Sequence, residues 1–289
     1  MREDLIYFSD RRFMHLGWGY VSSTHVHCAP VLSVTFERDF WVQGRPGSPG
    51  LVRRGVVIPP GAQHCADNSG QRGVALYFEP DGAEWAAVRE SLDRDGRLRW
   101  HGVVALDDDE SRDLVELIRP IDPARAGWRE LDDCMSAWIA CIAGARPSRG
   151  IDARVTRSAH LLRQDDAETR LSERRLAESV ALSGSRLRHL FKRETGVPLC
   201  RYRVWGRLRR AIQQLGAGAN PTDAALQAGF TDAAHFNHAF KANFGVSPAA
   251  LFGRGRPQPR VVVAPDFAAP ERLKQIAVPG DVSGSGTRS

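Results

Sequence analysis

An internal repeat in the second half of the sequence strongly limits what this part of the chain can fold into. Residues 187–197 match residues 236–246 at a constant offset of 49 positions, and both copies contain the pairs Phe-Lys and Gly-Val. The segment before each copy matches at an offset of 48, which pairs Ala177 with Ala225. Two copies of one short unit, with one extra residue in the second, predict a duplicated supersecondary structure.

Each copy has the pattern of a helix, a turn and a second helix. In the second copy, Gly229 and Phe230 end a short helix, and Thr231 or Asp232 caps the next one. Apolar residues then recur at three- and four-residue spacing, which places them on one helix face. Gly245 supplies a left-handed stop. A polar outer face remains available to a partner, so the pattern predicts a helix-turn-helix unit that reads DNA.

The repeat also carries a resemblance to a known family. The residues that match are Leu176-Ala177, Ser183, Leu187, Phe191-Lys192, Thr195-Gly196-Val197-Pro198, Gly229-Phe230, His235-Phe236, Phe240-Lys241 and Phe244-Gly245-Val246-Ser247-Pro248. Over residues 151–252 the chain resembles the paired helix-turn-helix domain of the AraC/XylS family of bacterial transcription regulators. The resemblance implies a seven-helix domain that sets two recognition helices into successive major grooves, with residues 199–215 as the connecting helix.

The resemblance further implies which residues contact DNA. Arginine reads guanine and asparagine reads adenine through paired hydrogen bonds, whereas phosphate contacts position the protein. Because two alanines lie on its reading face, we expect the second unit to contribute less sequence information than the first. His235 is expected to pack against its own domain. The expected DNA-contacting residues are Ser185, Arg186, Arg188, His189, Lys192 and Arg193 in the first unit, and Thr231, Ala233, Ala234, Asn237, His238 and Lys241 in the second.

Charge is divided unevenly along the chain. Residues 1–151 carry 18 basic and 22 acidic side chains, residues 152–252 carry 16 and 9, and the remainder carries 6 and 3. A basic region beside a mildly acidic one places a polyanionic partner on the C-terminal half. We therefore expect double-stranded promoter DNA to bind there.

Length and composition narrow the class of protein. A chain of 289 residues favours two domains. No run approaches the roughly 18 apolar residues of a membrane span, and the first residues lack the pattern of a secretory signal. The five cysteines are scattered and odd in number, which favours a reducing compartment over a disulfide framework. These features predict a cytoplasmic protein with no membrane partner.

The N-terminal half has the pattern of a β-rich domain. Short β-branched runs at 31–36, 56–58 and 74–78 are separated by Gly- and Pro-rich segments, as in barrels and jelly rolls. Helical patterns begin after residue 80. We predict an α+β chain: a cupin-like β-barrel with flanking helices over residues 1–145, a linker at 146–151, the all-α seven-helix domain at 152–252, and a tail without fixed fold at 253–289 apart from a short strand at 261–263.

Two short motifs support the barrel. The segment Gly19-x5-His25-x-His27 resembles the start of the first cupin motif, and Pro59-x-Gly61-x2-His64 resembles the second. In metal cupins three histidines and a glutamate converge on a divalent metal, but no acidic residue follows His27 within the expected distance. We therefore expect His25, His27 and His64 to line an effector pocket and expect no cofactor; a three-histidine metal site is the alternative. Cys28 and Cys65, next to motif histidines, leave thiol or metal sensing open, although strand alternation points each away from its neighbour.

A nearly apolar helix is predicted at residues 130–143, and two roles are open for it. It is either packed in the core or part of a dimer contact, as the corresponding region is in many members of the family. The linker at 145–150 and this helix are also where coupling between the halves is expected. The residues assigned to dimerisation are Met135, Trp138, Ile139 and Ile142.

The function that follows is regulation of transcription without enzymatic activity. The N-terminal half is expected to bind a small-molecule effector, and the C-terminal half to bind a promoter as a homodimer and to contact RNA polymerase. The family resemblance favours an activator. The alternative is a cupin-type metal sensor or metalloenzyme joined to a DNA-binding domain.

Overall fold

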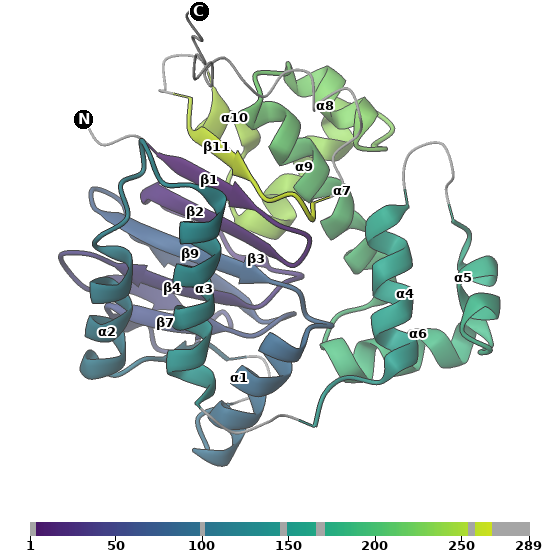
Figure 1. The fold of residues 1–289 in the computed structure, drawn as a ribbon, viewed down its shortest axis with the longest axis horizontal. Coiled ribbons are helices and arrows are strands. Elements are labelled where there is room, and N and C mark those ends of the chain that lie inside the picture. Colours follow the sequence, from purple (N-terminus) through teal and green to yellow (C-terminus); the bar gives the residue numbers. More distant parts are fainter. Residues whose placement is uncertain (1–3, 99–101, 145–148, 166–170, 254–257, 268–289) are drawn as a thin grey trace, which may run out of the picture.

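The computed structural model describes residues 4–98, 102–144, 149–165, 171–253 and 258–267. Within them, a β-rich N-terminal half with helices α1–α3 is followed by a helical half, α4–α10 (Figure 1). The strands are β1 (Leu5–Phe8), β2 (Arg12–Trp18), β3 (His25–Val26), β4 (Val31–Thr35), β5 (Phe40–Gln43), β6 (Leu51–Arg53), β7 (Gly55–Ile58), β8 (Gln63–Asp67), β9 (Arg72–Phe78), β10 (Val104–Ala105) and β11 (Arg260–Val263). The helices are α1 (Ala83–Arg94), α2 (Asp108–Ile118), α3 (Trp128–Ala143), α4 (Ala153–Gln164), α5 (Glu173–Ser179), α6 (Gly184–Thr195), α7 (Leu199–Gly216), α8 (Pro221–Gln227), α9 (Ala233–Phe244) and α10 (Pro248–Phe252). The predicted α+β class is confirmed in this form.

The strands form two sheets. One has seven strands in the order β10-β7-β4-β9-β2-β1-β11, and the other has four in the order β3-β8-β5-β6. All the pairings are antiparallel except that between β1 and β11. The short β3 pairs with β8 so that His25 lies opposite His64. The two predicted histidine motifs are therefore neighbours in one sheet.

The seven-stranded sheet is buried on both faces, and each face has a different covering. Leu5 and Tyr7 of β1 pack with α1–α3, whereas Ile6 and Phe8 of the same strand pack with residues of the helical half. This follows from the two-residue period of a strand, which sends successive side chains to opposite faces. One apolar core thus continues from one face of the sheet into the helical half, and a second core lies between the other face and α1–α3.

Helix α3 corrects the dimer prediction. Met135 and Trp138 are fully buried, and Ile139 and Ile142 are only 5% exposed, within a single chain. The helix packs beside α1 and α2 on one face of the sheet (Figure 1), so its apolar residues have partners on several sides. An apolar helix is buried by its surroundings, and here they belong to the same chain. Core packing is therefore the correct interpretation of these four residues.

Strand β11 lies in the predicted tail, at the position where a short strand was expected. Residues 260–263 lie parallel to β1 and extend the seven-stranded sheet at its edge, which Figure 1 shows in yellow beside purple. The three consecutive valines suit a strand, and β1 offers an unpaired edge. Arg260 fixes the position by donating to the carbonyls of Pro123 and Ala126 at 3.1 and 2.9 Å. The short strand predicted at 261–263 is present, and residues 268–289 lie outside the described part.

The predicted linker falls largely outside the described residues, since 145–148 are among those left out. Beyond them, the backbone N–H of Arg149 donates to Glu90 of α1 at 2.9 Å. In the described part of the chain, no helix combines the length and the apolar character that crossing a membrane requires.

Candidate nucleic-acid interface

The first helix-turn-helix unit consists of α5 and α6. Ser183 caps α6 by accepting a hydrogen bond from the backbone N–H of Arg186, and Gly196 ends the helix in the left-handed conformation with φ 82°. In the turn between the helices, Ala181 has φ 53°, an unusual value for a residue with a side chain. The predicted unit is present with the predicted stop.

The second unit, α8 and α9, repeats this construction. Of the two residues expected to cap α9, Asp232 does so by accepting from the N–H of His235 at 2.7 Å. Gly245 ends the helix with φ 74°, and the turn contains Gly229 at φ 87° where the first unit has Ala181. Both turns thus require one left-handed residue, and glycine meets that need without strain.

The residues expected to contact DNA lie on the outside of both units. Eleven of the twelve are exposed, and Ala233 is half-buried. The apolar residues on the opposite face, such as Leu187 and Phe236, are fully buried and hold the helices in place. The arrangement leaves both reading faces accessible, while contact with DNA itself stays a prediction.

The surface of the first unit is concave and basic. A groove of about 600 Å³ runs along α6 and is lined by Ser183, Ser185, Arg186, His189, Leu190, Arg193 and, from α4, Arg154. Arg154 was not predicted from the sequence, because it lies some 30 positions before the recognition helix. Two arginines of α6 already have acidic neighbours: Arg188 pairs with Glu173 of α5, and Arg193 pairs with Glu194 at 2.8 Å. Any ligand of Arg188 must therefore compete with Glu173.

His235 occupies an intermediate position. Its ring packs edge-on against Phe230 with 5.3 Å between the ring centres, and Nδ1 lies 3.1 Å from Thr231 Oγ1. The residue is nevertheless exposed. The predicted packing against its own domain is present, without burial.

The three motif histidines converge in the N-terminal half. His25, His27 and His64 are all at least 94% buried, and each offers a ring nitrogen within 4.8 Å of those of the other two. His25 Nε2 and His27 Nε2 are 3.2 Å apart. His25 Nδ1 lies 2.7 Å from the carbonyl of Ser23, and His64 Nδ1 lies 3.1 Å from that of Ala62.

Burial keeps these rings neutral at physiological pH. It lowers the pKa of His25, lowers that of His64 to about 3, and takes that of His27 well below its ordinary value. The neighbouring histidines add to the lowering for His27 and His64, while backbone contacts act in the opposite direction. A neutral imidazole has a free lone pair, so each ring can accept a hydrogen bond or bind a metal.

The adjacent cysteines point away from this cluster. Cys28 Sγ donates to the carbonyl of Arg201 at 3.4 Å, and burial raises the pKa of the thiol to about 12. Cys65 Sγ lies 3.8 Å from Gln43 Oε1. The alternation expected along a strand applies to Cys65 in β8, whereas Cys28 lies in a bend after β3. Neither thiol belongs to the group of possible metal ligands among the described residues.

The segment that bears His25 and His27 is hydrogen-bonded to the C-terminal end of α9. The backbone N–H and the hydroxyl of Ser23 both donate to the carbonyl of Gly245, at 2.9 and 2.8 Å. The backbone N–H of Cys28 donates to Asn243 Oδ1 at 3.2 Å. A Cβ added to Gly245 would lie 2.6 Å from both His25 Nδ1 and the carbonyl of Ser23. We call this contact between residues 22–28 and residues 243–245 the Gly245 clasp.

The second histidine motif meets the first unit in a similar place but more loosely. A Cβ added to Gly196 would lie 3.3 Å from the carbonyl of Pro60, and one added to Gly61 would lie 3.0 Å from the carbonyl of Gly196. Each of the two motifs thus touches the end of one recognition helix. These contacts could not be predicted from the sequence, since the clasp joins residues more than 200 positions apart.

A buried polar network joins the sheet to α4 and α7. Glu79 accepts hydrogen bonds from Tyr202, from Trp205 Nε1 at 3.1 Å and from Arg209 at 2.7 Å. Asp81 pairs with Arg163 at 2.9 Å. Burial raises the pKa of Asp81 to about 6, although Arg163 acts in the opposite direction. Both carboxylates are at least 98% buried, so their charges depend on these partners.

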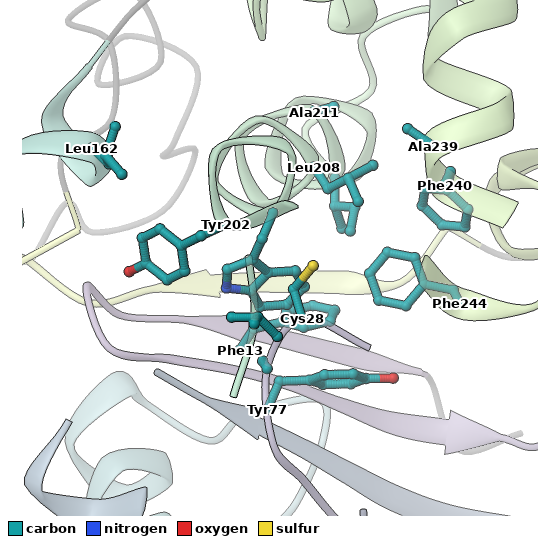
Figure 2. Close-up of a cluster of buried hydrophobic side chains, with 14 of the residues drawn as sticks. Phe13, Cys28, Tyr77, Leu162, Tyr202, Leu208, Ala211, Ala239, Phe240 and Phe244 are labelled. Carbon is teal, nitrogen blue, oxygen red and sulfur yellow. The ribbon is translucent and has the colours of Figure 1, made fainter. Parts of the chain in front are cut away.

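An aromatic cluster completes the contact between the halves. Phe13 and Tyr77 extend from the sheet toward Tyr202 and Phe244 of the helical half (Figure 2). The rings of Tyr77 and Phe244 are 5.8 Å apart, and that of His27 is 6.1 Å from Phe244. A small cavity of about 40 Å³ opens beside them, lined by both halves. None of the three motif histidines lines it, so the predicted effector pocket and this cavity are different places.

These features define a class of protein: one with two exposed helix-turn-helix units attached to a β-rich domain. Residues 176–254 match a family of helix-turn-helix domains. The C-terminal region is an AraC-type DNA-binding domain, in agreement with the resemblance seen in the sequence.

Three known proteins are similar to this chain. The bifunctional transcriptional activator/DNA repair enzyme Ada of Escherichia coli strain K12 is 30% identical over 155 residues, which are 48% of this chain and 44% of Ada. The chain therefore spans less than half the length of this relative. Unsaturated fatty acid-bound ToxT from Vibrio cholerae has the same overall fold, with a TM-score of 0.53 and 10% identity over 83% of this chain and 94% of ToxT. An AraC-type transcriptional regulator structure from Chromobacterium violaceum is 25% identical over 36% of this chain and 95% of its own, with a TM-score of 0.32.

Proposed function

We propose that the protein is a sequence-specific transcription regulator, an activator, that responds to a small-molecule effector bound by its N-terminal half. The observation that carries this proposal is the pair of recognition helices, α6 and α9, with exposed polar faces on a buried scaffold. The AraC-type domain and the activator among the similar proteins support it.

In the proposed complex the first unit supplies most of the affinity and specificity. Arg188 releases Glu173 and reads a guanine, while Ser185 and His189 approach neighbouring base edges. Arg186, Lys192 and Arg193 contact phosphates, and Arg154 extends this basic surface from α4. Each paired hydrogen bond to a base contributes roughly 1–3 kcal/mol of discrimination.

The second unit reads less and is held more firmly. Asn237 and His238 face the groove together with Ala233 and Ala234, and Thr231 and Lys241 lie near the DNA backbone. The Gly245 clasp joins this unit to the N-terminal half. A ligand that favours one arrangement of the clasp over another would shift the population of DNA-competent molecules by its difference in affinity for the two.

The effector site itself is proposed at the contact between the halves. The cavity beside Tyr77 and Phe244 is lined by mainly apolar side chains from both halves, and ToxT, which shares the fold, has been solved with an unsaturated fatty acid. Because that cavity is small, an effector there must separate the halves slightly, which would link its binding to the clasp.

The proposed regulator acts as a homodimer in the cytoplasm and contacts RNA polymerase. Since Met135, Trp138, Ile139 and Ile142 are buried, the dimer contact must use other residues. If the protein is instead a metalloenzyme, the three histidines are the only candidate metal centre within the described residues.

The test is a selection of genomic DNA fragments by the full-length protein at about 150 mM salt, where non-specific attraction is weakened. A shared sequence in the bound fragments is expected, and Arg188→Ala should reduce its enrichment and relax the preference at one base pair. Arg112→Ala, on an exposed face of α2, is the matched control for loss of one charge. Binding of all fragments alike, by both wild type and Arg188→Ala, would contradict the proposal.

A further inference from the structure

The histidine cluster has a feature that hydrogen bonding among neutral rings cannot satisfy. His25 Nδ1 and His64 Nδ1 each face a backbone carbonyl, which can only accept, so both nitrogens carry the proton. In a neutral imidazole the other nitrogen is then a bare lone pair. Both Nε2 atoms are therefore acceptors that are available inside the cluster.

His27 cannot complete this arrangement in either neutral form. If its Nε2 carries the proton, it donates to His25 Nε2 at 3.2 Å, and its buried Nδ1 is left as an acceptor with no partner. If Nδ1 carries the proton, two bare lone pairs face each other at that distance. A buried polar atom without a partner costs about 1–3 kcal/mol. A cation shared by the three Nε2 atoms would remove the facing lone pairs of the second form, with the His27 proton on Nδ1, for which the described residues offer no hydrogen-bond partner.

We infer that His25, His27 and His64 bind a first-row divalent transition metal of the zinc class. Imidazole nitrogen suits these metals, and three histidines form a known protein ligand set for zinc. With metal–nitrogen bonds of about 2.0–2.1 Å in tetrahedral geometry, ligand nitrogens lie roughly 3.3 Å apart. The 3.2 Å between His25 and His27 already matches that spacing, and all three donor atoms lie within 4.8 Å of one another.

The surroundings of the rings are also those of a metal site. Metal-bound histidines almost always donate their other ring N–H to a carbonyl or carboxylate, which fixes the ring and its tautomer. Ser23 and Ala62 provide such carbonyls for two of the three rings. These partners are backbone atoms of the same short segments that bear the histidines, so the orientation is built into strands β3 and β8.

The site is joined to the second recognition helix through very few bonds. Ser23, whose carbonyl orients His25, donates twice to the carbonyl of Gly245. Cys28, next to His27, donates to Asn243 in the last turn of α9. A metal that fixes the three rings would therefore stabilise the Gly245 clasp. This regulatory part rests on the proposed function, whereas metal binding does not.

The experiment uses the full chain, freed of metal with a chelator, and zinc alone as the probe. Equilibrium dialysis with elemental analysis should give one zinc per chain. Even the loss of an outer partner weakens metal binding about 10–100-fold, so His25→Ala and His64→Ala should each weaken it at least tenfold. His160→Ala, an exposed histidine of α4, should bind zinc like the wild type.

Two further measurements keep the inference testable if a variant fails to fold. Cobalt in place of zinc should give the visible absorption of a tetrahedral nitrogen-bound ion in the wild type, and His64→Gln can replace the alanine variant. Asn243→Ala should keep its zinc while zinc no longer changes its affinity for DNA. Wild-type chains without stoichiometric zinc, or zinc retained in both His25→Ala and His64→Ala, would overturn the metal site.

The outcomes separate this inference from the proposed function. DNA selection that succeeds without any metal overturns the metal site and leaves the regulator intact. Stoichiometric zinc in a chain that selects no DNA sequence supports the metal site and overturns the proposed regulator. Zinc that binds but leaves the DNA affinity of the wild type unchanged overturns the link to the clasp.

Discussion

The two helix-turn-helix units share one construction but differ in surface and attachment. The first presents a basic groove along α6, with Arg186, Arg188, Lys192 and Arg193 exposed. The second presents two alanines, Asn237 and His238, with Lys241 as the cation of α9. Conversely, α6 meets the N-terminal half through the contact at Gly196 and one hydrogen bond, from Arg89 of α1 to the carbonyl of Glu194 at 3.0 Å, whereas α9 is held by the three hydrogen bonds of the Gly245 clasp.

This difference indicates a division of labour. A surface rich in arginine binds DNA strongly wherever it is placed, and so offers little scope for control. A unit with a weak surface contributes only when it is held at the correct position relative to the first. In the function proposed above, the clasp fixes that position from the N-terminal half, and we therefore propose that an effector acts on the second unit.

The largest expected effect is a difference in stability between substitutions at Gly245, which ends α9, and at Gly196, which ends α6. Gly245→Ala combines the strain of a positive φ, about 1–3 kcal/mol, with overpacking against His25 and Ser23, about 1–3 kcal/mol. Gly196→Ala has the same strain of a positive φ. Its overpacking is smaller, because the nearest atom to the added Cβ is the Pro60 carbonyl oxygen at 3.3 Å. Urea unfolding of both variants should show the greater loss in Gly245→Ala. Equal losses would mean that the clasp is no tighter than the contact at Gly196.

The ion pair of Asp81 with Arg163 joins the N-terminal half to α4, and the protonation of Asp81 makes this contact depend on pH. Folded Asp81 keeps its proton up to about pH 6, above its ordinary value of 3.8, so the unfolded chain ionises first and this group makes stability fall as pH rises between those values. Asp81→Asn lacks that dependence. Its unfolding free energy relative to wild type should therefore rise by about 3 kcal/mol from pH 3.5 to pH 7. A difference that stays flat across this range would show that Asp81 is ionised in the folded protein at low pH.

The third prediction compares how much each unit contributes to base preference. Arg188→Ala should weaken binding to the selected site by about 1–3 kcal/mol and relax the preference at one base pair. Asn237→Ala should have a smaller effect on base preference, because its unit contributes less sequence information. Fluorescence anisotropy with a panel of single-base variants measures both. A larger change of preference in Asn237→Ala and His238→Ala than in Arg188→Ala and His189→Ala would contradict the division of labour.

The smallest expected effect concerns the turns. Ala181 adopts a left-handed conformation that glycine adopts freely, as Gly229 does in the second unit. Ala181→Gly relieves this strain but adds freedom to the unfolded chain, so we expect a net gain of only about 0.5 kcal/mol. Gly229→Ala should lose about 1 kcal/mol or more. Thermal unfolding of the two variants checks the opposite signs.

Local signals in the sequence predicted the helical half well. Capping by Ser183 and Asp232, the glycine stops and the three- and four-residue apolar spacing act within a few residues, so they can be recognised without the fold. The convergence of His25, His27 and His64 was also predictable, because two motifs with known strand positions carried them. In each case the physical cause lies near the residue in the chain.

What the sequence could not predict depends on distant partners. Ser23 and Gly245 are in contact although more than 200 residues separate them in the chain, and neither residue type predicts such a contact. The apolar residues of α3 suited both a core and a dimer contact, and only the position of the sheet and of α1 and α2 decides between them. The three valines at 261–263 predicted a short strand, but not its pairing with the edge of β1, which lies in the distant N-terminal half.

The most direct test of the account is hydroxyl-radical footprinting of the full-length protein on its selected site. Two recognition helices in successive major grooves predict two protected segments about 10 base pairs apart. Arg188→Ala should weaken both segments, since the first unit supplies most of the affinity, and Gly245→Ala should remove one of them. A single protected segment in the wild type, or two that persist unchanged in Gly245→Ala, would contradict the claim that the clasp positions the second unit on DNA.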